Sequence, residues 1–470
     1  MFRVLAFVLA VALCGGFLIS SYTAITDTAG DMTFTENVRF GDPSVLDGRR
    51  VQFDYQCGDH MLWAVDYRFG PEDRHSVEFT FDQHPVVSRP RETRESLTVY
   101  THSGIDMSMS GGNGFQPGHS GYGEMLRAVA ARTPDGGEFE MNLKLKDYLD
   151  YHQFNFELDY TSDKYVCHEH VDMMILLDEE NTYGDSPCYE DFSQLFRFPV
   201  MDSQIVSIKV QKGPDGKIWR IYFNTEDQTS VNVYNTATDE GLYCIPVYRG
   251  APDSEEMLPG EYAQGMGVYF IPWKPYDDGY TYANSRQRVT LDVEQAQNIL
   301  PLPEDTAVYG MQLDEETGNV WVLTLEDGIY ALNRITPEGG SIRLELMTLQ
   351  SDQDFQSPTW YRNNGLTLIY ANRQIALVSE GEVPKLELNV PVGEAFEGFY
   401  SFRRETGAML WADGVLYLMD HPHFRNFLNV MAFDPTGLLY WGEYQCSMLP
   451  EDVYGTYPYV EARYQPAVIE

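Results

Sequence analysis

Short apolar runs rich in β-branched and aromatic residues recur along the C-terminal part of the chain, joined in pairs by brief polar turns. The clearest copy is Val320–Leu332, where two such runs flank Glu326-Asp-Gly328. An Asp-Gly pair tolerates the positive φ angles of a tight turn, so this pattern is typical of a β-hairpin. Further copies lie at Leu366–Ser379 and Ala408–Met419. The pattern therefore predicts antiparallel β-structure.

The spacing of the turns indicates how the hairpins are arranged. Turn positions fall near Asp227, Asp278, Asp327, Asn372 and Asp413. The interval is about 40 to 50 residues, the length of one four-stranded propeller blade. A hairpin cannot bury its apolar face alone, so we expect the repeats to stack around an axis and share a core. The predicted fold is all-β, a propeller-like array of about six to eight four-stranded blades. The alternative is two β-sandwich domains, whose hairpins look alike without a fixed interval.

The N-terminus carries a continuous apolar segment. Val4–Ile19 follows Arg3 and has almost no polar interruption, and no Ala-x-Ala cleavage pattern comes after it. A run of this kind predicts a signal anchor over residues 1–22, with its N-terminus in the cytoplasm. We expect a single-pass protein of the cell membrane with the bulk of the chain extracytoplasmic. The alternative is secretion after cleavage of a signal peptide.

The remaining chain divides by composition into a spacer and two β-rich parts. Residues 23–48 are polar and predict a spacer or an edge strand leading away from the membrane. Residues 49–194 alternate as strands do, and they form either the first blades or a separate β-domain. Within them Met125, Leu126, Val129 and Ala130 recur at helical spacing, which predicts one short extra helix. Residues 195–470 form the expected propeller-like domain.

The hairpins at Asn319–Asn333, Leu366–Ser379 and Ala408–Met419 resemble the blades of quinoprotein-like or WD-type β-propellers. The resemblance covers roughly the C-terminal 270 residues. It implies a fold alone, since none of these families' catalytic signatures comes with it. No functional residue is therefore carried over from it.

Charge and composition exclude one class of partner. The chain has 71 acidic against 32 basic side chains and a formal net charge of −39, spread along its length. A surface of that potential repels phosphate backbones, so nucleic acid is excluded as a partner. An apolar content of 43% supports large packed cores.

Cysteines and histidines supply the few ligand types of interest. No Cys-x-x-Cys pattern occurs, but Cys167 and Cys188 are close enough in sequence to form a disulfide in an oxidising compartment. In a strand, His168 and His170 share one face, where two imidazoles begin a metal site if further ligands join them. The alternative is that these are ordinary surface histidines. No cofactor is predicted.

Aromatic residues gather near the expected blade ends. Trp273, Tyr276, Trp360 and Tyr361 are the candidate ligand-binding residues, because aromatic rings stack on sugars and grip peptides. The alternative is that strand aromatics fill the space between blades.

These features predict a membrane-tethered extracytoplasmic binding or sensing protein without catalytic activity. Its ligand would be a glycan, a peptide or a protein. The second hypothesis is an extracytoplasmic hydrolase or lyase, with carboxylates and histidines assembled at the channel of the propeller. No complete catalytic constellation is visible in the sequence, so no catalytic residue is assigned.

Overall fold

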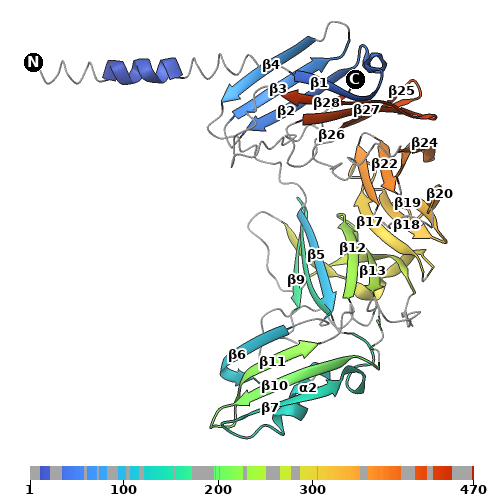
Figure 1. Cartoon of the computed structure of the whole chain (residues 1–470). Helices are drawn as coiled ribbons and strands as arrows, with labels where there is room; N and C mark the ends of the chain where they lie inside the picture. Colours follow the sequence, from blue (N-terminus) through green and yellow to red (C-terminus); the bar gives the residue numbers. More distant parts are fainter. Residues whose placement is uncertain are drawn as a thin grey trace, which may run out of the picture. The chain divides into compact units, whose positions relative to one another are not determined.

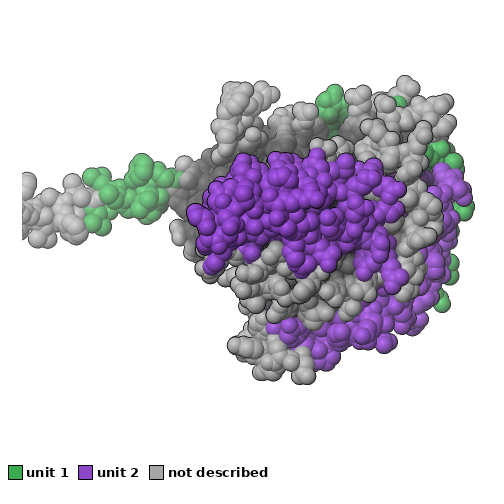
Figure 2. All heavy atoms as spheres, turned by 90° about the horizontal axis from the view of Figure 1, so that it is seen from below, with its two compact units in different colours: residues 1–89, 344–470 green, residues 90–343 purple. Residues whose placement is uncertain are grey.

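The fold is given by a computed structural model, which describes part of the chain. The described residues are 11–21, 34–57, 61–70, 74–81, 94–101, 106–115, 121–152, 154–171, 195, 197–198, 200, 202–225, 230–249, 265–276, 286–303, 305–349, 358–363, 365–371, 373–392, 408–420, 427–446 and 468–469. The chain divides into two compact units, residues 1–89 with 344–470 (unit 1) and residues 90–343 (unit 2), coloured separately in Figure 2.

Strands dominate both units, so the predicted all-β class is confirmed (Figure 1). Apart from short 3-10 turns, the helices of the described part are residues 11–21 and α2 (Gly121–Ala130). Within the described ranges, none of the helices has the length and apolar character needed to cross a membrane. Residues 1–10 lie outside those ranges, and the expected anchor stays a prediction.

Unit 1 contains three antiparallel sheets. The first has the strand order β1-β28-β27-β26-β25, the second β21-β22-β23-β24 and the third β29-β2-β3-β4. Their bounds are β1 Phe34–Gly41, β2 Arg50–Cys57, β3 Met61–Arg68, β4 Arg74–Phe81, β21 Thr359–Asn363, β22 Leu366–Ala371, β23 Gln374–Ser379, β24 Lys385–Pro391, β25 Ala408–Ala412, β26 Val415–Asp420, β27 Phe427–Asp434, β28 Gly437–Cys446 and β29 Val468–Ile469.

Segments from the two ends of the chain complete two of these sheets. β1 pairs antiparallel with β28, from Phe34 opposite Cys446 to Gly41 opposite Tyr440. β29 pairs with β2 through Val51 opposite Ile469. The sheets of unit 1 therefore join residues separated by most of the sequence.

The sheet formed by β25 to β28 is covered by apolar side chains on both faces. Along β26, Leu416 and Leu418 lie in a core shared with β21 to β24, whereas Tyr417 and Met419 lie in a core shared with β2 and β3. All four side chains are at most 5% exposed. Because successive side chains of a strand point to opposite faces, a strand between two cores must be apolar at every position. This explains the unbroken apolar run Val415–Met419.

Unit 2 contains an eight-stranded sheet and two four-stranded sheets. The large sheet has the order β12-β13-β14-β15-β9-β8-β5, with β16 also paired to β14; the others are β6-β11-β10-β7 and β17-β18-β19-β20. Their bounds are β5 Arg94–Thr101, β6 Asp106–Phe115, β7 Glu138–Lys144, β8 Phe154–Thr161, β9 Tyr165–Val171, β10 Ile205–Lys212, β11 Ile218–Thr225, β12 Ser230–Ala237, β13 Gly241–Arg249, β14 Gly267–Pro275, β15 Gln287–Leu291, β16 Gln297–Pro301, β17 Ala307–Leu313, β18 Val320–Glu326, β19 Ile329–Ile335 and β20 Ser341–Thr348.

The eight-stranded sheet curls until it is nearly closed. A short parallel contact joins β15 to β9 at Gln287 and Arg288, and the outer strands β5 and β12 lie next to each other. The enclosed core takes Leu158, Leu242 and Leu291 from three different strands, together with other apolar side chains. The opposite face of β13 and β14 packs against β17 to β19. This part of the sheet, like the β25 to β28 sheet, is thus covered on both faces.

The sheet β6-β11-β10-β7 has a different partner, the helix α2 (Figure 1). Tyr122, Met125, Leu126 and Val129 are buried on α2 in the core that this helix shares with the sheet. The predicted short helix is therefore confirmed, and its apolar spacing is explained by the sheet beneath it. The boundary expected between residues 194 and 195 falls inside unit 2, and that division stays a prediction.

The predicted turns have the backbone angles that the sequence pattern implies. Asp327 and Gly328 have φ of 50° and 74°, and Asp413 and Gly414 have φ of 54° and 79°. Two successive positive φ angles define the hairpin turn whose twist matches the flanking strands. The hairpins at Val320–Leu332 and Ala408–Met419 are therefore confirmed.

Replacing Gly328 tests whether the turn depends on backbone conformation alone. A Cβ added there would meet no heavy atom within 4 Å, so strain at positive φ is the main cost. We expect Gly328→Ala to lose about 1 kcal/mol of unfolding free energy, measured by urea denaturation. Gly381→Ala is the matched control. Its added Cβ also meets nothing within 4 Å, but its φ lies outside the left-handed range of +20° to +160°. Equal losses in both variants would contradict the assignment.

Candidate binding surface

Two turns of the nearly closed sheet lie at one end of it. The turn between β8 and β9 is tied to β15, since the Gln287 N–H donates to the Lys164 carbonyl at 2.9 Å. The turn between β12 and β13 is tied to β14, since the Trp273 N–H donates to the Glu240 carbonyl at 3.2 Å. Strand pairing thus brings Trp273 and Tyr276 to the same end of unit 2 as these turns.

Trp273 is held on two sides. Its ring stacks on Tyr160 with centroids 5.1 Å apart and an interplanar angle of 23°. Its indole Nε1 donates to the Thr238 carbonyl at 2.8 Å. The side chain is half-buried. Trp273 is therefore fixed in orientation while part of it stays accessible, as a preorganised binding aromatic requires.

Asp239 links the aromatic pair to a cation. It accepts from the Tyr160 hydroxyl at 3.1 Å and pairs with the Lys164 ammonium at 2.8 Å. Burial acts to raise the pKa of Asp239, but hydrogen bonds from Lys164, Ser162 and Tyr160 outweigh it and hold that pKa below its ordinary value. Burial also raises the pKa of Tyr160, which stays protonated as a donor. The cluster is thus a fixed polar support beneath Trp273.

Tyr276 lies at the same end, beside Arg288. The Arg288 guanidinium lies 4.0 Å from the centroid of its ring, and the Tyr276 N–H donates to the Arg288 carbonyl at 3.0 Å. Arg286 pairs with Asp163 at 3.8 Å nearby in the pairing of β15 with β9. Aromatic and charged groups therefore alternate at this end, which we call the Trp273 surface: Tyr160, Lys164, Asp239, Trp273, Tyr276 and Arg288.

The other two candidate aromatics lie in unit 1, on β21. Tyr361 is 3% exposed and belongs to the core between β21 to β24 and the β25 to β28 sheet. Its neighbour Trp360 points to the other face of the strand and is half-buried. Tyr361 is thus packed in this core, and ligand binding by Trp360 and Tyr361 stays a prediction.

The histidine and cysteine candidates lie on β9. His168 is exposed and bonds to Asp159 on the paired strand β8. Cys167 and Glu169 on the opposite face are buried, and the side chain of His170 lies outside the described part of the structure. Across the described ranges, no three His, Cys, Asp or Glu residues are placed to hold a metal ion. The metal site stays a prediction. So does the Cys167–Cys188 disulfide, because Cys188 lies outside the described residues.

Two further polar clusters serve the fold of unit 1. Glu36 on β1 accepts from the hydroxyls of Tyr440 at 2.7 Å and Tyr444 at 2.8 Å, which fastens β1 to β28. Arg362 and Glu380 form a two-pronged pair at 2.8 and 2.6 Å. Each joins strands of one sheet, so we assign both to stability.

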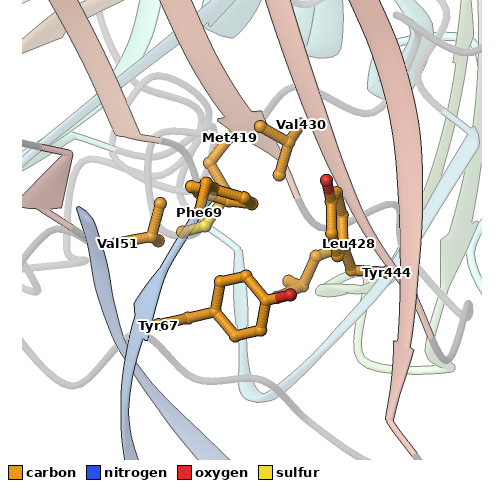
Figure 3. Close-up of a pocket in the computed structure, with 7 residues that line it drawn as sticks. All are labelled: Val51, Tyr67, Phe69, Met419, Leu428, Val430 and Tyr444. Carbon is orange, nitrogen blue, oxygen red and sulfur yellow. The ribbon is translucent and has the colours of Figure 1, made fainter. Parts of the chain in front are cut away.

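A small apolar cavity lies in unit 1 (Figure 3). Side chains of β2 and β3 converge on it with those of β26 to β28. Its lining residues are Val51, Tyr67, Phe69, Met419, Leu428, Val430 and Tyr444. It has room for about one water molecule, far less than the several hundred Å³, about 300 or more, of a ligand pocket. We interpret it as a packing gap between two sheets.

Sequence reasoning missed Tyr160, Lys164 and Asp239. Their link depends on β8 and β12 approaching in space, and no local motif encodes that approach. The one usable signal was the turn Asp239-Glu-Gly241, since such acidic turns lie at strand ends. Trp273 and Tyr276 were found because they stand out beside prolines in the sequence.

Comparison with known proteins assigns no family. No protein-family model and no curated protein matches the chain. Among solved structures, a nidogen/laminin complex is similar at 13% identity with a TM-score of 0.19, over 38% of this chain and 58% of that one. An ACO/RPE65 chimera matches at 11% identity and a TM-score of 0.23, over 94% and 95% of the two chains. The polysaccharide lyase Uly1 matches at 10% and 0.20, over 87% and 91%. Likenesses this weak carry neither fold nor function.

The ion pair of Asp239 with Lys164 predicts that the unfolding free energy depends on pH. A carboxyl whose pKa is depressed by folding stabilises the native state above its ordinary pKa, here 3.8, and loses that contribution as pH falls further. We expect Asp239→Asn to cost about 1 kcal/mol of unfolding free energy at pH 7. The difference from the parent chain should shrink below pH 3.8, as followed by urea denaturation at several pH values.

The control for this variant is Glu240→Gln, which removes an exposed carboxylate from the same turn. Its unfolding free energy should follow that of the parent chain at every pH. If Asp239→Asn instead loses the same stability at pH 3 as at pH 7, the ionised carboxylate is not the source of the effect.

Proposed function

We propose that this chain is a membrane-tethered binding or sensing protein exposed outside the cytoplasm. Its scaffold is a propeller-like array of sheets, and its ligand, a glycan, peptide or protein segment, binds at the Trp273 surface. The proposal rests on two aromatic side chains, Trp273 and Tyr276, at one end of the nearly closed sheet. Trp273 is held by Tyr160 and Thr238, and Tyr276 by Arg288.

The proposed scaffold explains why sheets are covered on both faces. In a two-layer sandwich each sheet keeps one face toward solvent. The β25 to β28 sheet instead has Leu418 in one core and Met419 in another, as stacking around an axis requires. On this proposal the sheet backed by α2 is a separate layered module inserted between β5 and β12, and the other sheets supply the blades.

The proposed tether rests on the helix at residues 11–21. Its apolar side chains point outward on several sides, with Leu13 67%, Phe17 73% and Ile19 69% exposed. A helix that is apolar all round and unburied by protein is suited to a lipid environment. This favours the anchor over a core helix, and residues 1–22 together are long enough to enter a bilayer.

The proposed ligand contact follows from the chemistry of the Trp273 surface. A half-buried indole offers stacking area at little entropic cost, because its orientation is already fixed by Tyr160 and Thr238. Tyr276 and Arg288 add a second aromatic face and a donor. Sugars and extended peptides both use this combination. The hydrolase or lyase hypothesis stays the alternative, and across the described ranges no three His, Cys, Asp or Glu residues are placed to hold a metal ion for such chemistry.

The test uses the full chain reconstituted into phosphatidylcholine vesicles. We expect it to float with the vesicles and to be captured by members of a glycan and peptide array. Tyr276→Ala and Trp273→Ala should each weaken capture by about tenfold, since loss of one aromatic anchor typically costs more than 1 kcal/mol. Affinity would be measured by interferometry against each captured probe.

The matched control is Tyr234→Ala, which removes a half-buried tyrosine that packs on a different core of unit 2. Its binding should be that of the parent chain. Residues 23–470 alone should remain in the soluble fraction. If the full chain does not float with the vesicles, the tether is wrong. If Tyr276→Ala and Trp273→Ala leave capture unchanged, the site is wrong. If the mass of a captured probe changes, the protein is an enzyme.

A further inference from the structure

The sheet β6-β11-β10-β7 has two unlike faces. Val206, Ile208 and Val210 of β10 are buried in the core with α2. The residues between them, Ser207 and Lys209, are half-buried on the opposite face. On β7 the corresponding side chains Glu138, Glu140 and Asn142 are exposed. On β7 and β10, this face of the sheet is therefore open and polar.

A β-bulge places an exposed tryptophan on that open face. Ile218 and Ile221 are both buried in the α2 core, although strict alternation would put them on opposite faces. The pairings of β11 with β10 and with β6 both shift register between Ile218 and Arg220. The extra residue is Trp219, which is 46% exposed. Bulges re-aim side chains in this way, and here Trp219 joins Arg220 on the open face.

The polar groups on this face are held in place by one another. Glu138 pairs with the Lys209 ammonium at 3.0 Å and accepts from Gln211 at 2.7 Å, which acts to lower the pKa of Glu138. Ser207 donates to Glu140 at 2.9 Å. The polar side chains of β7 and β10 thus bond to one another across the sheet. The face is preorganised.

Tyr222 lies at the centre of this network. Arg220 lies 4.9 Å from the centroid of its ring and Lys209 lies 5.5 Å from it. Trp219 and Tyr222 are three positions apart on one strand, so their Cα atoms are separated by roughly 10 Å. That is a span which two linked sugar rings can cover. We call this set of residues the Trp219 face: Glu138, Glu140, Ser207, Lys209, Gln211, Trp219, Arg220 and Tyr222.

We infer that the Trp219 face binds a neutral oligosaccharide. The apolar faces of pyranose rings stack on Trp219 and Tyr222. The sugar hydroxyls donate to the remaining lone pairs of the Glu138 carboxylate and bond to Gln211 and Ser207, whose side chains can accept and donate. Charge favours a neutral ligand. The face carries two cations and two carboxylates, on a chain whose net charge is −39. A polyanion meets overall repulsion, and a polycation meets carboxylates already engaged with Lys209, Gln211 and Ser207.

This site is independent of the proposed function, because it uses a different sheet and none of the residues of the Trp273 surface. The experiment uses the full chain in detergent micelles, run in native gels that contain one soluble polysaccharide each. Neutral probes are xyloglucan, mixed-linkage β-glucan and galactomannan, and anionic probes are heparin and polygalacturonate. We expect retardation by at least one neutral probe, unchanged by added salt, since the binding is not ionic.

Variants locate the binding on the face. Trp219→Ala and Tyr222→Ala should each weaken it by about tenfold, whereas Trp219→Phe keeps a stacking ring and should retain most of it. Val383→Ala is the matched control, since it removes another exposed apolar side chain, 69% exposed, in unit 1. Tyr276→Ala should leave the retardation unchanged, which distinguishes this site from the Trp273 surface. Unchanged thermal unfolding of Trp219→Ala excludes a folding defect.

The inference is overturned if no neutral probe retards the chain, or if heparin or polygalacturonate alone does so. It is also overturned if retardation by a neutral probe survives Trp219→Ala and Tyr222→Ala. Loss of retardation in Tyr276→Ala with retention in Trp219→Ala would assign the glycan to the Trp273 surface instead.

Discussion

The structure depends on apolar faces that are shared between successive sheets. A four-stranded sheet is too small to be stable alone, because one or both of its apolar faces would remain in water. Here Leu416 and Leu418 on β26 are buried against one neighbour and Tyr417 and Met419 against another. The β13 and β14 part of the nearly closed sheet has the same property. These two sheets are thus stabilised by packing on both faces.

This constraint also explains how the ends of the chain are used. Two sheets of unit 1 are completed by distant segments, because β1 and β29 add strands to β28 and β2 from opposite ends of the sequence. Glu36 then fastens β1 through two buried tyrosine hydroxyls. In unit 2, the strand ends and turns of the nearly closed sheet present side chains, and the Trp273 surface lies there.

Local signals predicted the parts of the fold that are local. The Asp-Gly turns, the hairpins around them and the helix α2 follow from residues within one short window. The parallel contact of β15 with β9 and the approach of β5 to β12 join distant segments, so no sequence pattern marked them. The same holds for the sites. Trp273 and Tyr276 were visible by type, but Asp239 and Lys164 required the fold, and Trp219 required a bulge that shifts it out of alternation.

The measurement that tests the shared-face account most directly places a charge on each face of β26 in turn. Leu418→Asp and Met419→Asp alter neighbouring side chains that are 0% and 1% exposed, one in each core. The account predicts that both variants lose at least about 3 kcal/mol of unfolding free energy in urea denaturation, because each leaves a buried unpaired charge or forces a core open. If either variant is as stable as the parent chain, one face of this sheet lies open to water and the sheets do not support one another as described.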